Sequence, residues 1–573
     1  MKPDRANFVR VLYVCGVGFA AWATVGTTAS PAAEREGLSA NGRKGLVVSV
    51  SRLATEIGVQ TLESGGNAVD AAVATAFALA VTFPEAGNIG GGGFMLVAPG
   101  GAAEPAVIDY RETAPSSTRK NSFETTTTRL GHQLAGVPGT VRGLALAHQS
   151  YGKLSWQAIV APAAALARNG FVVNQPLADS LNAILDDSKR FAEFQRVLGK
   201  HEGREKWLAG DRLVQPDLAR TLDRIGHDGP NAFYEGEIAG QIVAEMQAGD
   251  GWITRADLAN YRARLRPALH GTFRGYDVYC PPAQAGGICL IEMLNILENF
   301  DLRRQGRWSP ETLHLCIEAM RRAYADRARH LGDPDFTTIP DKLTRKDYAR
   351  KIASEINRLK ATPSAEVAPD IPLTDAGPQT THFSVIDASG MAVANTYTLE
   401  QSYGSRVIVR GAGFLLNDEM GDFNWRPGYT DRRGAIGTPA NQVAPGKRML
   451  SSQTPTIVMK NGAPVLITGT PGGRTIINTV LCVVLNVLEF EMTPRDAVDS
   501  PRLHHQWFPD RISCEAGLHR DHAAALKQLR EMGHEIYLYA VRQGDAHTIH
   551  IDPASGQRTA IADPRRDGWA AGQ

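Results

Sequence analysis

The first part of the mature chain has patterns that predict a short strand followed by two helices. Residues 45–50 form a short apolar run of strand length, and residues 53–63 have a helical pattern that Gly65 and Gly66 would stop. Residues 68–82 are rich in Ala and apolar on nearly every side. A helix with no polar face belongs in an interior, so this segment predicts a buried helix.

The middle of the chain, from about residue 151 to 359, is rich in helical patterns with charged faces, such as residues 310–331. We expect this region to form a helical layer that covers a core. Near the other end, residues 470–473 open an apolar helix that runs to about residue 488.

Strand patterns dominate beyond residue 380. Residues 381–386 and 391–399 flank a turn at 387–390 and predict a β-hairpin. Residues 456–459 and 464–468 predict a second hairpin around Asn461 and Gly462, a pair that favours two-residue loops. The chain thus has a helix-rich first part and a strand-rich second part.

The N-terminus has the features of a secretory signal peptide. Basic residues precede an apolar run at 11–25, and small residues follow at 27–33. The run is shorter than the roughly 18–20 apolar residues that a spanning helix needs, which disfavours an uncleaved anchor. We therefore expect residues 1–33 to be removed, with cleavage at about 29–33, and we expect a secreted protein of the bacterial periplasm without a stable membrane anchor.

Charge and cysteine usage narrow the function classes. The 573 residues carry 61 basic and 60 acidic side chains, a net charge of +1, so no overall field favours nucleic acid. Five cysteines follow the predicted signal peptide, without Cys-x-x-Cys spacing and with apolar neighbours, and they are expected to be buried structural thiols. Their disulfide state stays open. They are Cys280, Cys289, Cys316, Cys482 and Cys514.

Residues 379–385 lie where a loop-like stretch at 374–379 meets a predicted strand. Thr is common in strands, so taken alone this segment indicates structure rather than chemistry. Several other blocks change that interpretation, because together and in order they resemble the γ-glutamyltransferase family over nearly the whole mature chain. The blocks are residues 65–71, 87–94, 109–115, 380–385, 396–399, 403–405, 416–423, 450–452 and 471–473.

The resemblance implies a fold and a self-processing reaction. Members of the family are N-terminal nucleophile hydrolases, with two antiparallel sheets between helical layers in a four-layer αββα sandwich. Their nucleophile attacks the preceding peptide bond, which here joins Gln379 to Thr380. Cleavage would give a large subunit, 34–379, and a small catalytic subunit, 380–573, that stay associated. The freed α-amine titrates near pH 8 and would serve Thr380 as its base, with no cofactor.

Three further residues are implied to act with Thr380. A hairpin folded about Ser389 places residue 380 opposite Thr398, close enough to hydrogen-bond, which matches the family's use of a second Thr to orient the first. An ordinary cross-strand Thr pair is the alternative. Gly472 and Gly473, at the start of an apolar helix, would offer N–H groups to an oxyanion.

A γ-glutamyl group needs one cationic and one acidic partner. Arg111 with Ser451 and Ser452 would hold its α-carboxylate. Three acids would hold its α-ammonium, although each of them could instead be a solvated loop charge. Many relatives carry Asn at the position of Glu400. The acids are Glu400, Glu419 and Asp422.

A long loop at 424–434 resembles the lid that covers the pocket in some relatives. Some bacterial relatives have Tyr where this chain has Arg433, and Tyr429 or Trp425 are candidate substitutes.

Two other motifs are interpreted as structural. The pairs His504–His505 and His547–His550 lack a third ligand, so no metal site is expected. The glycine run at 90–93 lacks the Lys-Ser/Thr of a phosphate loop and predicts a tight turn.

The resemblance thus predicts an enzyme that acts on γ-glutamyl amides such as glutathione, with water or amino acid and dipeptide acceptors. Two alternatives stay open. One is an acylase of the glutaryl-7-aminocephalosporanic acid type from the same family, and the other is a secreted binding protein that keeps the fold without the chemistry. The presence of Glu419 and Asp422 disfavours the first, and the presence of Thr380 and Arg111 disfavours the second.

Overall fold

The computed structural model describes residues 36–101, 103–371, 381–538 and 542–573. The predicted signal peptide, the loop at 374–379 and the residues Gln379 and Thr380 lie outside the described residues. Gly37–Gln573 form one compact unit.

Two seven-stranded sheets form the centre of this unit within the described residues, and all neighbouring strands are antiparallel. The first sheet has the order β19-β2-β10-β11-β3-β4-β7. Its strands are β2 (Leu46–Ser49), β3 (Gly92–Ala98), β4 (Ala106–Asp109), β7 (Arg264–Pro267), β10 (Thr381–Ile386), β11 (Ala392–Thr398) and β19 (Trp569–Gly572).

The second sheet has the order β1-β18-β17-β13-β12-β9-β8. Its strands are β1 (Ser39–Gly42), β8 (Leu269–Phe273), β9 (Tyr276–Cys280), β12 (Thr456–Lys460), β13 (Ala463–Thr468), β17 (Thr548–Ile551) and β18 (Arg558–Ile561).

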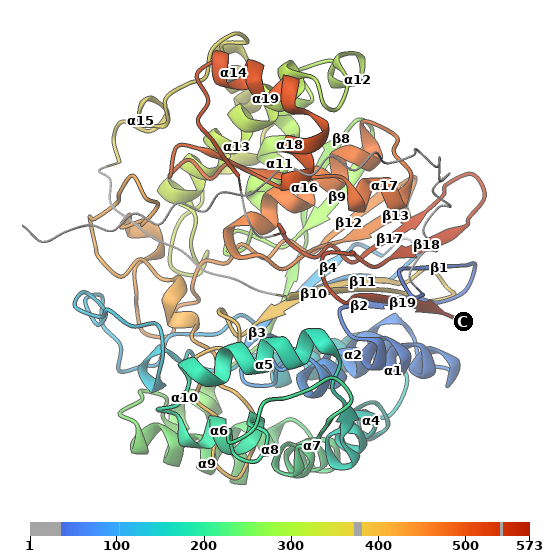
Figure 1. Cartoon of the computed structure of the whole chain (residues 1–573), viewed down its shortest axis with the longest axis vertical. Helices are drawn as coiled ribbons and strands as arrows, with labels where there is room; N and C mark the ends of the chain where they lie inside the picture. Colours follow the sequence, from blue (N-terminus) through green and yellow to red (C-terminus); the bar gives the residue numbers. More distant parts are fainter. Residues whose placement is uncertain (1–35, 102, 372–380, 539–541) are drawn as a thin grey trace, which may run out of the picture. The chain divides into compact units, whose positions relative to one another are not determined.

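Side chains that alternate along the strands produce three layers of core. In β2, Leu46 and Val48 pack between the two sheets, whereas Val47 packs against helices on the outer face. In β12 of the second sheet, Ile457 lies between the sheets and Val458 contacts the other helical layer. The fold is therefore the predicted four-layer αββα sandwich of the α+β class (Figure 1).

Each outer layer is a group of helices. The first sheet is covered by α1 (Arg52–Glu63), α2 (Ala68–Thr82), α3 (Thr140–Tyr151), α4 (Trp156–Asn169), α5 (Gln175–Asp187), α7 (Pro216–Asp228) and α9 (Glu237–Ala248). The second sheet is covered by α11 (Gly287–Leu297), α13 (Pro310–His330), α14 (Lys346–Glu355), α16 (Ile476–Leu488) and α19 (Ala523–Glu531).

The elements with strong local patterns have the predicted bounds to within one residue. The buried helix is α2, in which all residues from Ala68 to Thr82 are buried, and Asn67 and Asp70 form a capping box at its start. The second hairpin is β12–β13, and its turn residues Asn461 and Gly462 have φ of 51° and 77°, as the two-residue turn requires.

The middle of the chain differs from the prediction of a single covering layer. It contributes helices to both outer layers, and it also supplies β7, β8 and β9 to the two sheets. β7 and β8 lie at sheet edges, and most of their side chains are exposed or half-buried, so they lack the apolar pattern that marks a strand.

All five cysteines of this unit are buried and free, which confirms that they are structural thiols. Burial raises the pKa of the Cys316 thiol to about 12, so this thiol stays protonated. Among the described residues, no helix is long and apolar enough to cross a membrane.

Candidate functional site

The hairpin β10–β11 has the predicted register. Its pairs run from Thr381 opposite Tyr397 to Ile386 opposite Ala392, and every pair is centred on Ser389. The pair of Thr380 with Thr398 involves a residue outside the described part of the chain and stays a prediction.

Thr398 is the last residue of β11, and hydrogen bonds hold it in place. Its side chain is buried, and its Oγ1 accepts a hydrogen bond of 2.8 Å from the backbone N–H of Glu400. Its carbonyl accepts from Asn88 Nδ2 at 2.9 Å, and Asn88 Oδ1 in turn accepts from the N–H of Gly91. A Cβ on Gly91 would lie 2.0 Å from the Thr398 carbonyl oxygen, so the glycine run allows two backbones to approach closely beneath the site.

The three predicted acids converge. One carboxylate oxygen from each of Glu400, Glu419 and Asp422 lies within 4.8 Å of the others. Glu419 and Asp422 come from one short 3-10 turn, and Glu400 has a φ of 81°, a strained conformation for a side-chain-bearing residue.

These carboxylates are short of hydrogen-bond donors. Glu400 Oε1 and Glu419 Oε1 are buried and accept no hydrogen bond from the described residues, whereas Glu419 Oε2 is paired with Arg111. Burial, followed by the charges of Asp422 and Glu419, raises the pKa of Glu400 well above its usual range. A cation with N–H donors would relieve both the repulsion and the missing hydrogen bonds.

Arg111 serves as the internal counter-ion of this acidic group. It is fully buried, with Nη2 2.6 Å from Glu419 Oε2 and bonded to Asp422, and with Nη1 3.3 Å from Glu112 Oε2. Burial lowers the pKa of Arg111, but Glu419 and its neighbours outweigh that effect and raise it. Arg111 is not among the described residues that line the pocket beside it, and its contact with a substrate carboxylate stays a prediction.

A single pocket brings five predicted residues together. Its wall contains Glu400, Asp422, Ser451, Ser452 and Gly473. It also contains residues that the sequence did not indicate, among them Arg327, Asn441 and Arg474.

Only one of these missed residues had a signal that could have found it. Arg474 directly follows the glycine pair, whereas Arg327 is one of many charged residues of α13 and has no local mark of a pocket residue.

Ser451 and Ser452 are held at the pocket by neighbouring elements. The N–H of Ser451 donates to the Gln284 carbonyl at 2.8 Å. Arg327 Nη2 donates to Ser452 Oγ at 3.0 Å and to the Ser451 carbonyl at 3.1 Å. Two hydroxyls and a guanidinium at one place can bind a carboxylate.

The glycine pair forms a tight turn before α16. Gly472 and Gly473 have φ of 133° and 57°, and Gly473 begins a 3-10 turn, Gly473–Thr475, that precedes the helix. The predicted apolar helix therefore begins later than expected, at Ile476. A Cβ on Gly472 would lie 2.5 Å from Thr475 Oγ1, which explains the need for glycine.

The predicted lid borders the pocket. Asn424 of this loop lines the pocket, as does Ile436 just beyond it, and Arg474 Nη1 donates to the Gly434 carbonyl of the loop. Trp425 is anchored, since its ring stacks on Phe123 at 5.1 Å and its Nε1 donates to the Met420 carbonyl. Tyr429 is 44% exposed.

The predicted structural histidines have protein partners. Asn478 Nδ2 lies 2.8 Å from His504 Nδ1, His505 Nε2 is 3.3 Å from Asp510, and His547 Nε2 is 3.0 Å from Asp545.

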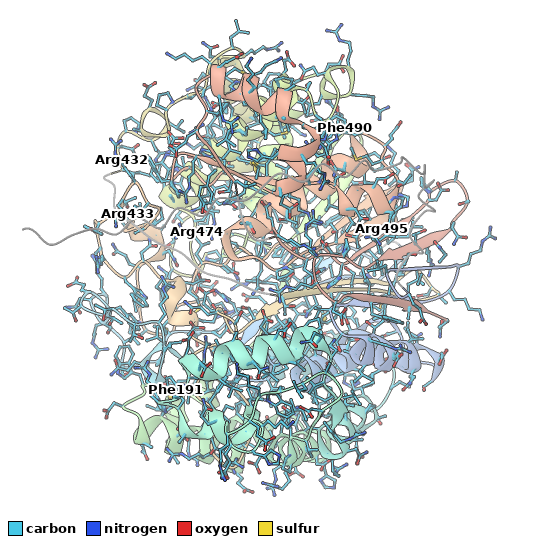
Figure 2. The ribbon with its side chains drawn as sticks, viewed as in Figure 1. Phe191, Arg432, Arg433, Arg474, Phe490 and Arg495 are labelled. Carbon is cyan, nitrogen blue, oxygen red and sulfur yellow. The ribbon has the colours of Figure 1, made fainter. Side chains whose placement is uncertain are left out.

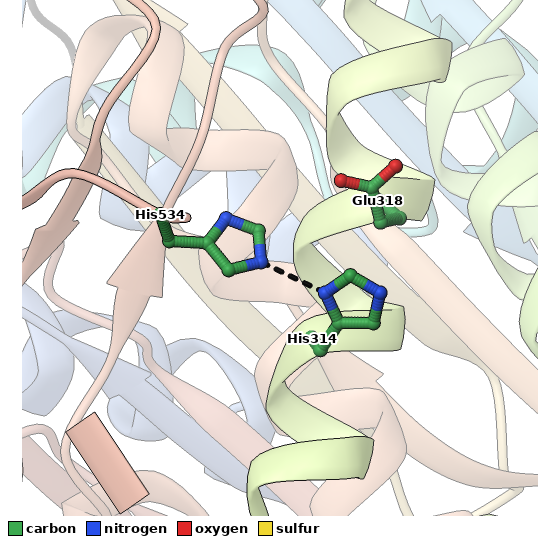
Figure 3. Close-up of side chains that lie close together, drawn as sticks. All are labelled: His314, Glu318 and His534. Carbon is green, nitrogen blue, oxygen red and sulfur yellow. Dashed lines mark hydrogen bonds between the residues drawn. The ribbon is translucent and has the colours of Figure 1, made fainter. Parts of the chain in front are cut away.

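A cluster of His314, Glu318 and His534 was not predicted (Figure 3). Its two rings are hydrogen-bonded at 2.8 Å, and Arg321 and Arg322 already pair with the Glu318 carboxylate. Those two guanidiniums disfavour a further cation there.

The architecture and the sequence identify the class and then the family. Two antiparallel sheets between helical layers, with an apolar helix after a glycine pair at the pocket, define an N-terminal nucleophile hydrolase fold. The family profile described as Gamma-glutamyltranspeptidase matches residues 54–573. A "Glutathione hydrolase proenzyme" from Escherichia coli is 43% identical over 532 residues, which cover 91% of this chain and 90% of the relative. The chain belongs to the γ-glutamyltranspeptidase family.

Solved structures agree with this assignment. A cephalosporin acylase from Bacillus halodurans matches with a TM-score of 0.82 at 25% identity, over 96% of this chain and 99% of the other. A γ-glutamyltranspeptidase from Helicobacter pylori is 41% identical with a TM-score of 0.55, over 57% of this chain and 96% of the other.

Proposed function

We propose that this chain is a self-processing γ-glutamyltransferase and glutathione hydrolase. It takes the γ-glutamyl group of glutathione or a related amide onto Thr380 and passes it to water or to an amino acid or dipeptide. The observation that carries the proposal is the pocket that Glu400 and Asp422 share with Ser451, Ser452 and Gly473, in which the buried Glu400 Oε1 accepts no hydrogen bond from the described residues.

The acidic side of the pocket suits the α-ammonium of the donor. An ammonium has three N–H donors, which matches the three carboxylates of Glu400, Glu419 and Asp422. Its positive charge offsets the repulsion that raises the Glu400 pKa. The α-carboxylate is assigned to Ser451 and Ser452, with Arg111 as the cation.

The reaction itself is assigned to Thr380. Its own α-amine, free after cleavage, accepts the hydroxyl proton as the oxygen attacks the γ-carbonyl. N–H groups of Gly472 and Gly473 stabilise the oxyanion, and the amine returns the proton to the leaving nitrogen. Water or an acceptor amine then releases the acyl group from Thr380, whose hydroxyl Thr398 orients.

Processing between Gln379 and Thr380 would give subunits 34–379 and 380–573, after loss of a signal peptide at 1–33 and export to the periplasm. The E. coli relative is named a proenzyme, which supports a processed chain. The hairpin register supports the placement of residue 380 beside Thr398.

Mass spectrometry of the purified protein tests the processing step. We expect two fragments, the smaller of which begins at Thr380, and we expect the Thr380→Ala variant to stay intact and inactive. A wild-type chain that stays whole after long incubation, or turnover by Thr380→Ala, would refute the proposal.

A donor comparison tests the substrate class. The enzyme should release the anilide from γ-glutamyl anilide, faster when glycylglycine is present if transfer contributes. Glutaryl anilide, which lacks the α-ammonium, should be a poor donor. Preference for the glutaryl compound would instead support the acylase alternative. The structural similarity to a cephalosporin acylase is the reason to test it.

A further inference from the structure

Arg474 is a cation of the pocket for which the proposed chemistry has no role. It follows Gly473 directly in the chain, and both residues line the pocket together with Ser452. Its position next to the predicted oxyanion turn places it near the point where the donor's amide bond is cut.

The residue is held on two sides. Arg474 Nη1 donates to the Gly434 carbonyl of the lid, and its own carbonyl accepts a hydrogen bond from the Tyr324 hydroxyl of α13. Figure 2 labels Arg474 together with Arg432 and Arg433, the two lid residues that precede Gly434. A guanidinium held in this way loses little freedom when it binds an anion, which favours binding.

The electrostatic surroundings also favour an anion. Burial, and then the nearby charge of Arg327, lower the pKa of Arg474 to about 10, although the charge of Asp422 acts in the opposite direction, so Arg474 remains charged at neutral pH beside a second guanidinium. Like charges in a partly buried site repel, and a bound carboxylate would reduce that repulsion.

Arg327 is not the better candidate for this role. Its Nη2 donates to Ser452 Oγ and to the Ser451 carbonyl, so it positions the two serines. Arg474, by contrast, directly follows the predicted oxyanion turn in the chain and bonds to the lid at Gly434.

We propose that Arg474 binds the carboxylate of the leaving peptide, and equally that of an incoming peptide acceptor, so that the enzyme prefers γ-glutamyl donors whose leaving group ends in a free carboxylate. This inference rests on the proposed function. Glutathione meets the requirement, because its leaving cysteinylglycine ends in a carboxylate.

The test compares glutathione with its C-terminal amide, which differs at that carboxylate only. For the wild type we expect kcat/KM to be about tenfold or more higher for the acid, the typical effect of one charge-assisted hydrogen bond. Arg474→Gln should bring the two donors to within about twofold, and Arg474→Lys should keep part of the preference.

Arg495→Gln is the matched control, because Arg495 pairs with Asp499 and contacts the carbonyls of Leu38 and Ala562, away from the pocket. It should keep the wild-type preference. A wild type that does not discriminate, or an Arg474→Gln variant that loses both donors equally, would overturn the inference; the second result would assign Arg474 to the γ-glutamyl group itself.

The ratio of kcat/KM for glutathione to that for its amide is measured on the wild type alone. A wild type that does not discriminate therefore overturns the inference even if Arg474→Gln fails to fold or to process. A wild type that turns over neither donor would instead refute the proposed function. In a second arm, glycylglycine should be a better acceptor than glycylglycinamide for the wild type, and Arg474→Gln should remove that difference.

Discussion

At the scale of single residues, the ionised form of Glu400 is unfavourable in the protein without substrate. Its carboxyl is buried, one of its oxygens accepts no hydrogen bond from the described residues, and Asp422 and Glu419 lie close to it. Arg129 lies 3.8 Å away and offsets only part of this, since the pKa of Glu400 remains raised. Such a site is costly when it is empty and favourable when an ammonium fills it.

Substitution of Glu400 by Gln should stabilise the empty protein in a pH-dependent way. Because the folded-state pKa is raised, the neutral acid is tolerated, and a penalty appears as the pH rises above the ordinary carboxyl value. We therefore expect Glu400→Gln to raise Tm more at pH 8 than at pH 5, with weaker donor binding at both.

Thermal unfolding of both proteins at the two pH values measures this effect. Glu56→Gln is the control, because Glu56 forms an exposed pair with Arg52 and its loss should change Tm little at either pH. An equal gain for Glu400→Gln at both pH values would contradict the charge-based explanation.

At the scale of elements, the end of β11 depends on the glycine run before β3. β11 lies between β10 and β3 in the first sheet, so Thr398 is approached by backbone from the glycine segment. Asn88 bridges the two segments through the Thr398 carbonyl and the Gly91 N–H. The position of Thr398 is thus set by a contact that only glycine permits.

Gly91→Ala should disturb the site through this contact. The new Cβ would lie 2.0 Å from the Thr398 carbonyl oxygen, so β11 must shift. We expect a loss of about 1–3 kcal/mol in the free energy of unfolding, together with slower processing and turnover.

Gly226→Ala is the matched control, since Gly226 lies within α7 and a Cβ there meets Val160 only at 3.4 Å. Denaturant unfolding should show unchanged or slightly higher stability for this variant, because Ala favours helix over Gly. If Gly91→Ala unfolded and reacted like the wild type, the close backbone contact would have no role.

At the scale of the whole molecule, the two predicted subunits are interleaved rather than side by side. In the first sheet, β19, β10 and β11 come from the part after residue 380, and β2, β3, β4 and β7 come from the part before it. The core between the sheets likewise draws on both parts, for example Leu96 and Ile467. Cutting one peptide bond leaves these strand pairs and this core in place.

We therefore expect the cleaved fragments to separate only on denaturation. The processed protein should elute in gel filtration at the volume of the uncut Thr380→Ala variant, and it should show two bands on a denaturing gel. Fragments that separated in native buffer would contradict the interleaved sheet.

Local sequence determined the elements whose pattern is strong by itself. The buried helix α2, the hairpins β10–β11 and β12–β13 and the register about Ser389 follow from side-chain periodicity, capping and turn residues, which act over a few positions. The resemblance added the family, and it indicated five residues that the structure brings to one pocket.

Tertiary structure decided what depends on contacts between distant segments. The edge strands β7 and β8, half-exposed and weakly patterned, exist because their partners in the sheet supply hydrogen bonds that no local periodicity records. Arg327 and Arg474, 147 positions apart in the chain, meet at one pocket because α13 and the turn before α16 pack there. Charge, burial and the shifted pKa of Glu400 arise only from that convergence, since an isolated carboxyl in an extended chain remains hydrated and titrates in its ordinary range.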